Sequence, residues 1–178
     1  MKSSFTKILL ILVVVACGVF NASSQLNKKV DELEKIFMNG EHNDQLSVHY
    51  DLTKIDDSLS YFLALSKLYD LGNNENIVSL NQLHNKFKEN KTIEDYSKWY
   101  DQVKDIYPVA IGLVKHKNLT DQHKSMLSRY EATFNSAVHT IAYSSFNSSV
   151  REYEKETSGF ISSFIKGLTG VKGVGTFD

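Results

Sequence analysis

The chain has 178 residues, of which 42% are hydrophobic, and carries 20 basic against 21 acidic side chains. This length suffices for one hydrophobic core, so a single domain is expected. The net charge of −1 argues against nucleic acid as a partner, because nucleic-acid-binding domains usually present a basic face. Phosphate-loop and dinucleotide-binding glycine patterns are also absent from the sequence.

The first 24 residues have the layout of a secretory signal peptide. Lys2 and Lys7 precede an unbroken apolar run over residues 8–17, which is too short to span a membrane, and small polar residues follow up to Ser24. We therefore expect a secreted protein with a signal peptide over residues 1–24, a helical domain over 25–166 and a glycine-rich tail over 167–178. Ala16 and Gly18 offer an earlier cleavage site.

The single cysteine, Cys17, lies inside this leader. Cleavage after Ser24 would leave a cysteine-free mature chain, held by packing alone, without disulfides or cysteine-based zinc sites. Residues 14–17 (VVAC) also resemble a bacterial lipobox, in which Cys17 would be lipidated. The sequence leaves both interpretations open.

Three helices are expected in the first half of the domain. Apolar residues recur at helical spacing over residues 26–37, and Asn39-Gly40 should end that helix. A second, densely apolar run covers residues 55–69, and Gly72 suits the left-handed position past its end. A third helix is expected over about residues 76–88.

The sequence between residues 92 and 142 gives the strongest helical pattern. Thr92 and Asp95 form a capping box, and the apolar residues that follow recur every three or four positions. Pro108 should end or kink this helix, because it lacks an N–H and clashes with the preceding turn; residues 109–117 then read as a short extension. Thr120 or Asp121 should open the longest helix, up to about Ser145.

The remaining residues predict one more helix and a frayed end. Ser149 and Glu152 form a second capping-box pattern, and residues 153–168 repeat an apolar face at helical spacing. The glycine-rich tail is expected to fray. No segment alternates as a strand would, so the predicted fold is all-α: a single-domain bundle of five to seven amphipathic helices.

No constellation in the sequence predicts a reaction. The six histidines are scattered, with no pair at the i, i+4 spacing of a helical zinc site, and adjacent acids such as Asp56 and Asp57 lie at expected helix starts, where they complement the helix dipole. We therefore expect no catalytic residues, no metal site and no cofactor, and interpret the chain as a non-enzyme.

Three glycosylation sequons lie outside the leader, at Asn90, Asn118 and Asn147. All three fall at expected breaks between helices, which suits glycans on surface loops. Asn and Ser also mark turns and helix caps for conformational reasons, which explains the same placement.

Aromatic residues make up 11% of the chain, and many fall on the expected apolar faces. Core packing explains them, because each ring buries a large area. A second explanation is an interior cavity for an apolar ligand, such as an acyl chain of about fifteen methylenes, whose full burial would contribute roughly 12 kcal/mol gross. From the apolar faces, the candidate lining residues are Phe62, Trp99, Val103, Tyr130, Phe134, Phe160 and Phe164.

Two segments, residues 91–104 (KTIEDYSKWYDQVK) and 119–127 (LTDQHKSML), resemble the nematode fatty-acid- and retinol-binding family over about residues 88–142. The shared pattern is an acidic-aromatic helix start with a lysine-bearing helix, then a leucine and acidic cap opening a long helix. The resemblance implies a secreted, all-α carrier of fatty acids and retinoids with an interior cavity. It transfers no individual binding residue.

Two alternatives to a carrier remain open from the sequence. One is a secreted helical protein-interaction module with a packed core and no ligand, which predicts small voids and an exposed apolar patch. The other gives residues 158–174 a transient membrane contact, which predicts outward-facing Phe160, Phe164 and Leu168.

Overall fold

The computed structural model describes residues 2–41, 47–171 and 173–177. Helices form from Lys2–Asn39 (α1), Val48–Leu68 (α2), Glu75–Phe87 (α3), Ile93–Lys115 (α4), Asp121–Ala142 (α5), Ser145–Thr157 (α6) and Phe160–Thr169 (α7). Within these ranges no strand forms, so the all-α prediction is confirmed.

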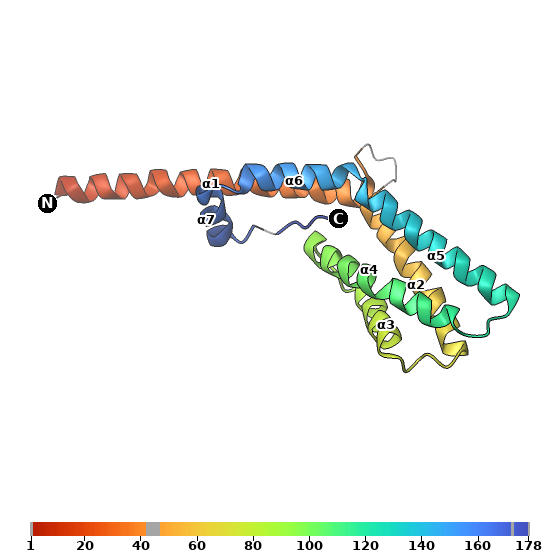
Figure 1. Cartoon of the computed structure of the whole chain (residues 1–178). Helices are drawn as coiled ribbons and strands as arrows, with labels where there is room; N and C mark the ends of the chain where they lie inside the picture. The colour runs from red at the N-terminus through yellow and green to blue at the C-terminus, as the bar shows by residue number, and fades with distance from the viewer. Residues whose placement is uncertain (1, 42–46, 172, 178) are drawn as a thin grey trace.

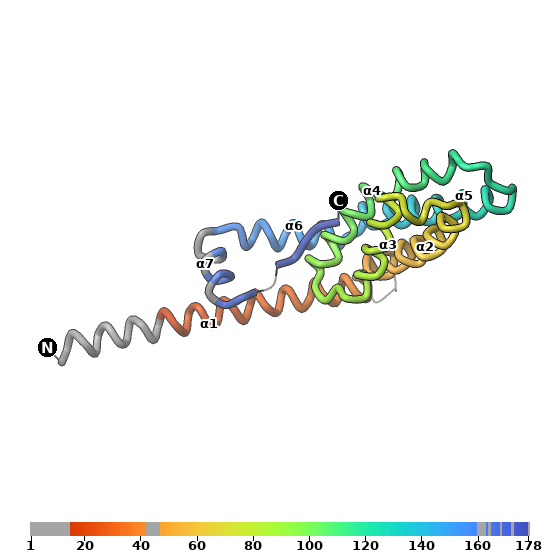
Figure 2. Tube along the Cα trace, turned by 90° about the horizontal axis from the view of Figure 1, so that it is seen from below, coloured from red at the N-terminus to blue at the C-terminus, as the bar shows by residue number. Residues whose placement is uncertain are grey.

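The helices form two antiparallel pairs that meet at an angle (Figure 1). α2 packs along α5, and α1 runs alongside α6. α3 and α4 make a hairpin that covers α2, while α7 folds back against α1. Figure 2, seen from below, shows the C-terminal end of the chain returning from α7 between α6 and α4.

A polar side chain caps the first turn of each helix from α2 to α6, whereas Gly159 before α7 provides no side-chain cap. Thr92 and Asp95 form the predicted capping box, with reciprocal N–H···O bonds of 3.1 Å, and Thr120 Oγ1 accepts the His123 N–H at 3.2 Å. The second predicted box, at Ser149, is wrong. α6 already begins at Ser145, capped by Ser144, and the Ser149 hydroxyl lies inside the helix.

Pro108 does not end its helix, contrary to the sequence expectation. α4 continues through it to Lys115. Proline removes one backbone hydrogen bond, but Tyr107, Ala110 and Val114 are fully buried on the same face to either side. Tertiary packing of this face therefore outweighs the local preference of proline.

Helix termination follows the sequence at one predicted site and departs from it at another. Gly40, with φ +79°, stands directly after α1, as predicted. After α2 the left-handed residue is Asp70, with φ 58°, and not Gly72. Aspartate tolerates this conformation better than most non-glycine residues, because its short side chain bonds locally.

The last described residues of the C-terminal tail, 173–177, dock on the helices, contrary to the expectation that the tail frays. α7 extends to Thr169, and the φ of Gly170 is +65°, where the chain turns back. Phe177 is fully buried among aromatic rings. Burial of the Phe177 ring stabilises the position of residues 173–177, although the glycines of this segment alone predict disorder.

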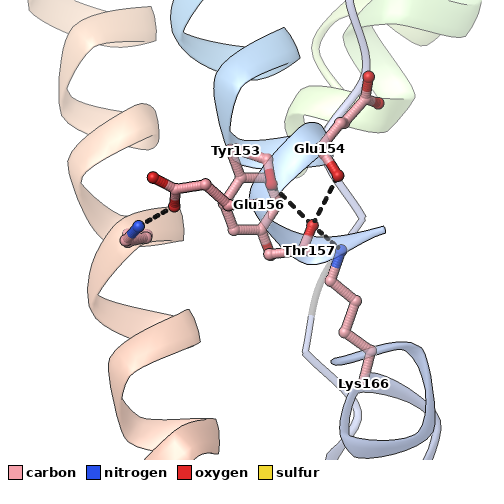
Figure 3. Close-up of polar contacts among 6 residues, drawn as sticks. Tyr153, Glu154, Glu156, Thr157 and Lys166 are labelled. Carbon is pink, nitrogen blue, oxygen red and sulfur yellow. Dashed lines mark hydrogen bonds and ion pairs between the residues drawn. The ribbon is translucent and has the colours of Figure 1, made fainter. Parts of the chain in front are cut away.

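A small polar cluster joins α1, α6 and α7 (Figure 3). Lys29 pairs with Glu156, and the Thr157 hydroxyl donates to the Tyr153 carbonyl at 2.8 Å while accepting from Lys166 Nζ at 2.7 Å. Lys166 Nζ also lies 4.7 Å from the centre of the Tyr153 ring. Partial burial lowers the Lys166 pKa from its ordinary value.

The half-buried ring of His49 makes the free energy of unfolding depend on pH, and the direction of this dependence follows from its pKa. Its ring packs against Phe37, Phe87 and Tyr96, and this burial lowers its pKa below the ordinary 6.5. The unfolded chain therefore binds more protons below pH 6.5, so the stability that neutral His49 contributes is lost as pH falls below that value. Urea unfolding at pH 7.5 and 5.5 should show this loss.

The matched comparison is between His49→Phe and His116→Gln, since His116 is exposed. His49→Phe should reduce the difference in unfolding free energy between the two pH values, and His116→Gln should leave it unchanged. Equal pH dependence in the wild-type chain and both variants would contradict this assignment.

Candidate functional site

The candidate site is an open groove of about 460 Å³ between α2 and α5. Both helices present matching stripes at i, i+3, i+4 and i+7 spacing. We call the space that they line the α2–α5 groove; its residues are Lys54, Asp57, Ser58 and Tyr61 from α2, and Met126, Arg129, Tyr130 and Thr133 from α5. A volume of this size falls in the range of small-molecule sites.

Aromatic and aliphatic surface forms the apolar part of the groove. The rings of Tyr61 and Tyr130 stack at 5.8 Å between centroids and an interplanar angle of 12°. Tyr61 remains 61% exposed, and Met126 lies half-buried beside the pair. Exposed stacked rings offer a large apolar surface, so they suit contact with an apolar ligand.

The polar part of the groove carries a cationic excess, with Lys54 and Arg129 against Asp57. Lys54 is already engaged, because its Nζ lies 3.1 Å from Asp51 Oδ1 and 4.2 Å from the centre of the Tyr50 ring. Arg129 is exposed and makes no ion pair within the described residues. A planar guanidinium of this kind can bind a carboxylate with two parallel hydrogen bonds.

The lining residues expected from the sequence are not gathered around one cavity. Phe62, Val103 and Phe134 are at most 4% exposed and belong to the continuous core. Trp99 is buried between α4 and α3, where Nε1 donates to the Leu83 carbonyl at 2.8 Å. Of the candidates with described side chains, only Tyr130 lines the groove; the side chains of Phe160 and Phe164 lie outside the described residues.

Direct ring contacts occupy the space between Phe62 and Phe134, two of the residues expected to line a cavity. The Tyr107 ring lies 4.2 Å from the Phe134 centroid and 5.1 Å from that of Phe62. The Tyr107 hydroxyl is buried and has no hydrogen-bond partner among the described residues. Desolvation, with the nearby charge of Glu131 as a smaller cause, raises the pKa of this phenol far above its ordinary value.

The three sequons differ in accessibility. Asn118 is exposed between α4 and α5, and Asn90 is half-buried between α3 and α4. Asn147 lies inside α6 and not at a helix break, and only 2% of it is exposed. Its Nδ2, which would carry the glycan, already donates to the carbonyls of Ile141 and Phe177. A glycan on Asn147 is therefore incompatible with this arrangement of the C-terminal end.

Sequence reasoning missed the groove because it ranked positions by apolar character. Tyr61, Met126 and Arg129 lie beside the main apolar stripes of α2 and α5, on faces that read as polar. The sequence feature that marks the groove is a second set of residues at helical spacing on each helix, with one tyrosine and one cationic side chain in each set. Nothing in the sequence shows that these two repeats face each other.

Other kinds of site are not found in the described part of the chain. No group of three histidine, cysteine, aspartate or glutamate side chains is placed to hold a metal there. None of the helices, as far as they are described, has the length and apolar content needed to cross a membrane. Comparisons with protein-family models, curated proteins and solved structures find no match to this chain.

Proposed function

We propose that this chain is a secreted helical carrier of hydrophobic ligands with an acidic head group, of the fatty-acid class, and that the α2–α5 groove binds them. The observation that carries the proposal is the pairing of an exposed aromatic stack, Tyr61 and Tyr130, with Arg129, which has no ion pair within the described residues. An acyl chain would cover the rings while its carboxylate meets the guanidinium.

Exposure along α1 supports secretion. From Val15 onward, Val15, Cys17 and Phe20 are exposed and Val19 is half-buried. The first buried side chain along this stretch is Ser23, next to the expected cleavage site. Apolar side chains that contribute little to packing can be removed at small cost to the domain. The full chain is not cysteine-free, because it contains Cys17; only the mature chain would be.

The binding free energies expected for the acyl chain and for the head group show that the chain alone binds weakly and that the head group is needed for useful affinity. A half-open groove removes only part of an acyl chain from water, and burial equivalent to about ten methylenes gives roughly 8 kcal/mol gross. Association costs at least about 4 kcal/mol, which leaves about 4 kcal/mol, or millimolar affinity. An added charge-assisted contact at Arg129 is then needed for micromolar binding.

Arg129→Glu should weaken binding of oleate at least tenfold, which corresponds to about 1.4 kcal/mol, because it replaces an attraction for the carboxylate by a repulsion. Retinol, which has no carboxylate, should change by less than about twofold. Displacement of a fluorescent fatty acid measures both ligands.

Lys86→Glu on α3 makes the same charge change away from the groove and should leave oleate binding intact. Saturable oleate binding that Arg129→Glu does not affect would refute the proposed site. Absence of binding by a folded, helical wild-type sample would refute the carrier.

The packed interior favours a second candidate function, a secreted protein-interaction module. Beyond the groove, Tyr143 and Leu68 are 79% and 70% exposed, as residues of an interaction surface can be. If oleate and retinol both fail to bind, the same exposed residues become the positions to substitute in a search for a protein partner.

A further inference from the structure

The C-terminal segment, residues 173–177, binds in a pocket that side chains of several helices form. The fully buried Phe177 enters a socket of three rings, Phe37 of α1, Tyr100 of α4 and Phe146 of α6, with centroid distances of 5.7, 5.7 and 5.9 Å. We call these three residues the aromatic socket. Its members come from helices far apart in the sequence.

Polar side chains beside the aromatic socket bind the main chain of the segment. Asn147 Nδ2 donates to the Phe177 carbonyl at 2.9 Å, and Asn147 Oδ1 accepts the Phe177 N–H at 2.8 Å. Ser97 Oγ donates to the Thr176 carbonyl at 2.7 Å. Extended peptides are recognised in this way, with backbone bonds giving affinity and a pocket giving specificity.

Close packing adds a sequence requirement to the site. A Cβ at Gly175 would lie 2.9 Å from the Ser97 Cβ and Oγ. A Cβ at Gly173 would meet only the end of the Glu94 side chain, which is half-exposed and can move away, so the requirement concerns Gly175. A glycine two positions before an aromatic residue is therefore the pattern that fits. The segment of this chain has both, with Gly175 two positions before Phe177.

We propose that the aromatic socket with Asn147 and Ser97 is a peptide-binding site, and that the C-terminal segment of a second copy of this chain can occupy it in exchange for the internal one. A second copy carries the matching glycine and phenylalanine by identity. The segment joins α7 through Gly170, whose left-handed conformation is accessible to glycine without strain. Exchange of a terminal element between copies needs no new contacts, so its cost is low.

The test uses a fluorescein-labelled peptide of residues 170–178, the unglycosylated full chain and two variants with a vacated socket. Phe177→Ala removes the internal ring, and Gly175→Val blocks docking of the internal segment while leaving every socket residue in place. Circular dichroism and urea unfolding identify the variant that remains folded. That variant should bind the peptide at least tenfold more tightly than the wild-type chain does.

Two controls locate the binding. A peptide with alanine at the position of Phe177 should not bind, and adding Asn147→Leu to the folded variant should abolish binding. The proposal is overturned if the folded variant with the empty socket does not bind the peptide. It is also overturned if the wild-type chain binds the peptide as tightly as that variant does.

Exchange itself is measured by light scattering after refolding over a concentration series. The wild-type chain should form a dimer fraction that rises with protein concentration and that Phe177→Ala removes. A wild-type chain that stays monomeric throughout the series overturns the exchange.

Discussion

Replacement of Phe134 by alanine should lower the free energy of unfolding by about 3–5 kcal/mol, the usual cost of removing a buried phenylalanine from a close-packed core. The Phe134 ring is 4% exposed and lies 4.2 Å from the Tyr107 centroid. Its loss leaves a cavity that two neighbouring helices cannot close without moving. Urea unfolding followed by circular dichroism measures the change.

The matched control is Tyr61→Ala, which removes an aromatic ring of similar size from the α2–α5 groove. Because Tyr61 is 61% exposed, its loss should change stability by no more than about 0.5 kcal/mol. A Phe134→Ala variant of near wild-type stability would show that this ring borders a space and is not part of the packed core.

Asn147→Leu should cost about 2–3 kcal/mol, although leucine fits the volume and α6 tolerates it. Three hydrogen bonds depend on the Asn147 amide, one with the Ile141 carbonyl and two with the backbone of Phe177. Each buried group left without a partner costs about 1–3 kcal/mol. Release of the C-terminal segment into water limits the total.

Asn118→Leu provides the control, because Asn118 is exposed, and it should stay within about 0.5 kcal/mol of the wild-type chain. Hydrogen exchange of the Phe177 amide adds a local measurement. This amide should lose protection in Asn147→Leu only, and retained protection there would contradict the role assigned to Asn147.

The helices could be predicted wherever the cause is local. The capping box at Thr92 and Asp95 needs only residues three apart, and the turn at Gly40 needs one glycine, so both follow from the sequence. Pro108 could not be predicted in the same way. Its helix continues because of burial by other helices, and that burial depends on the complete fold.

The candidate site and the C-terminal segment lie beyond sequence reasoning for the same reason. The apolar faces predict that Phe62 and Phe134 are buried, but burial against another ring and burial against a cavity require the same residue types. The glycines around Phe177 predict a frayed tail, in which this ring would be exposed. Its aromatic socket is assembled by three helices whose contacts no local pattern encodes.

A methyl NMR titration with oleate tests the ligand site most directly. Labelled methionine methyl groups report on Met126 in the α2–α5 groove and on Met38, which is exposed on α1 and does not line the groove. Labelled valine methyl groups report on the fully buried Val103. The groove predicts a saturable shift of the Met126 signal, with Met38 and Val103 unchanged. Saturation of Val103 with Met126 unmoved would contradict it and indicate a ligand inside the core.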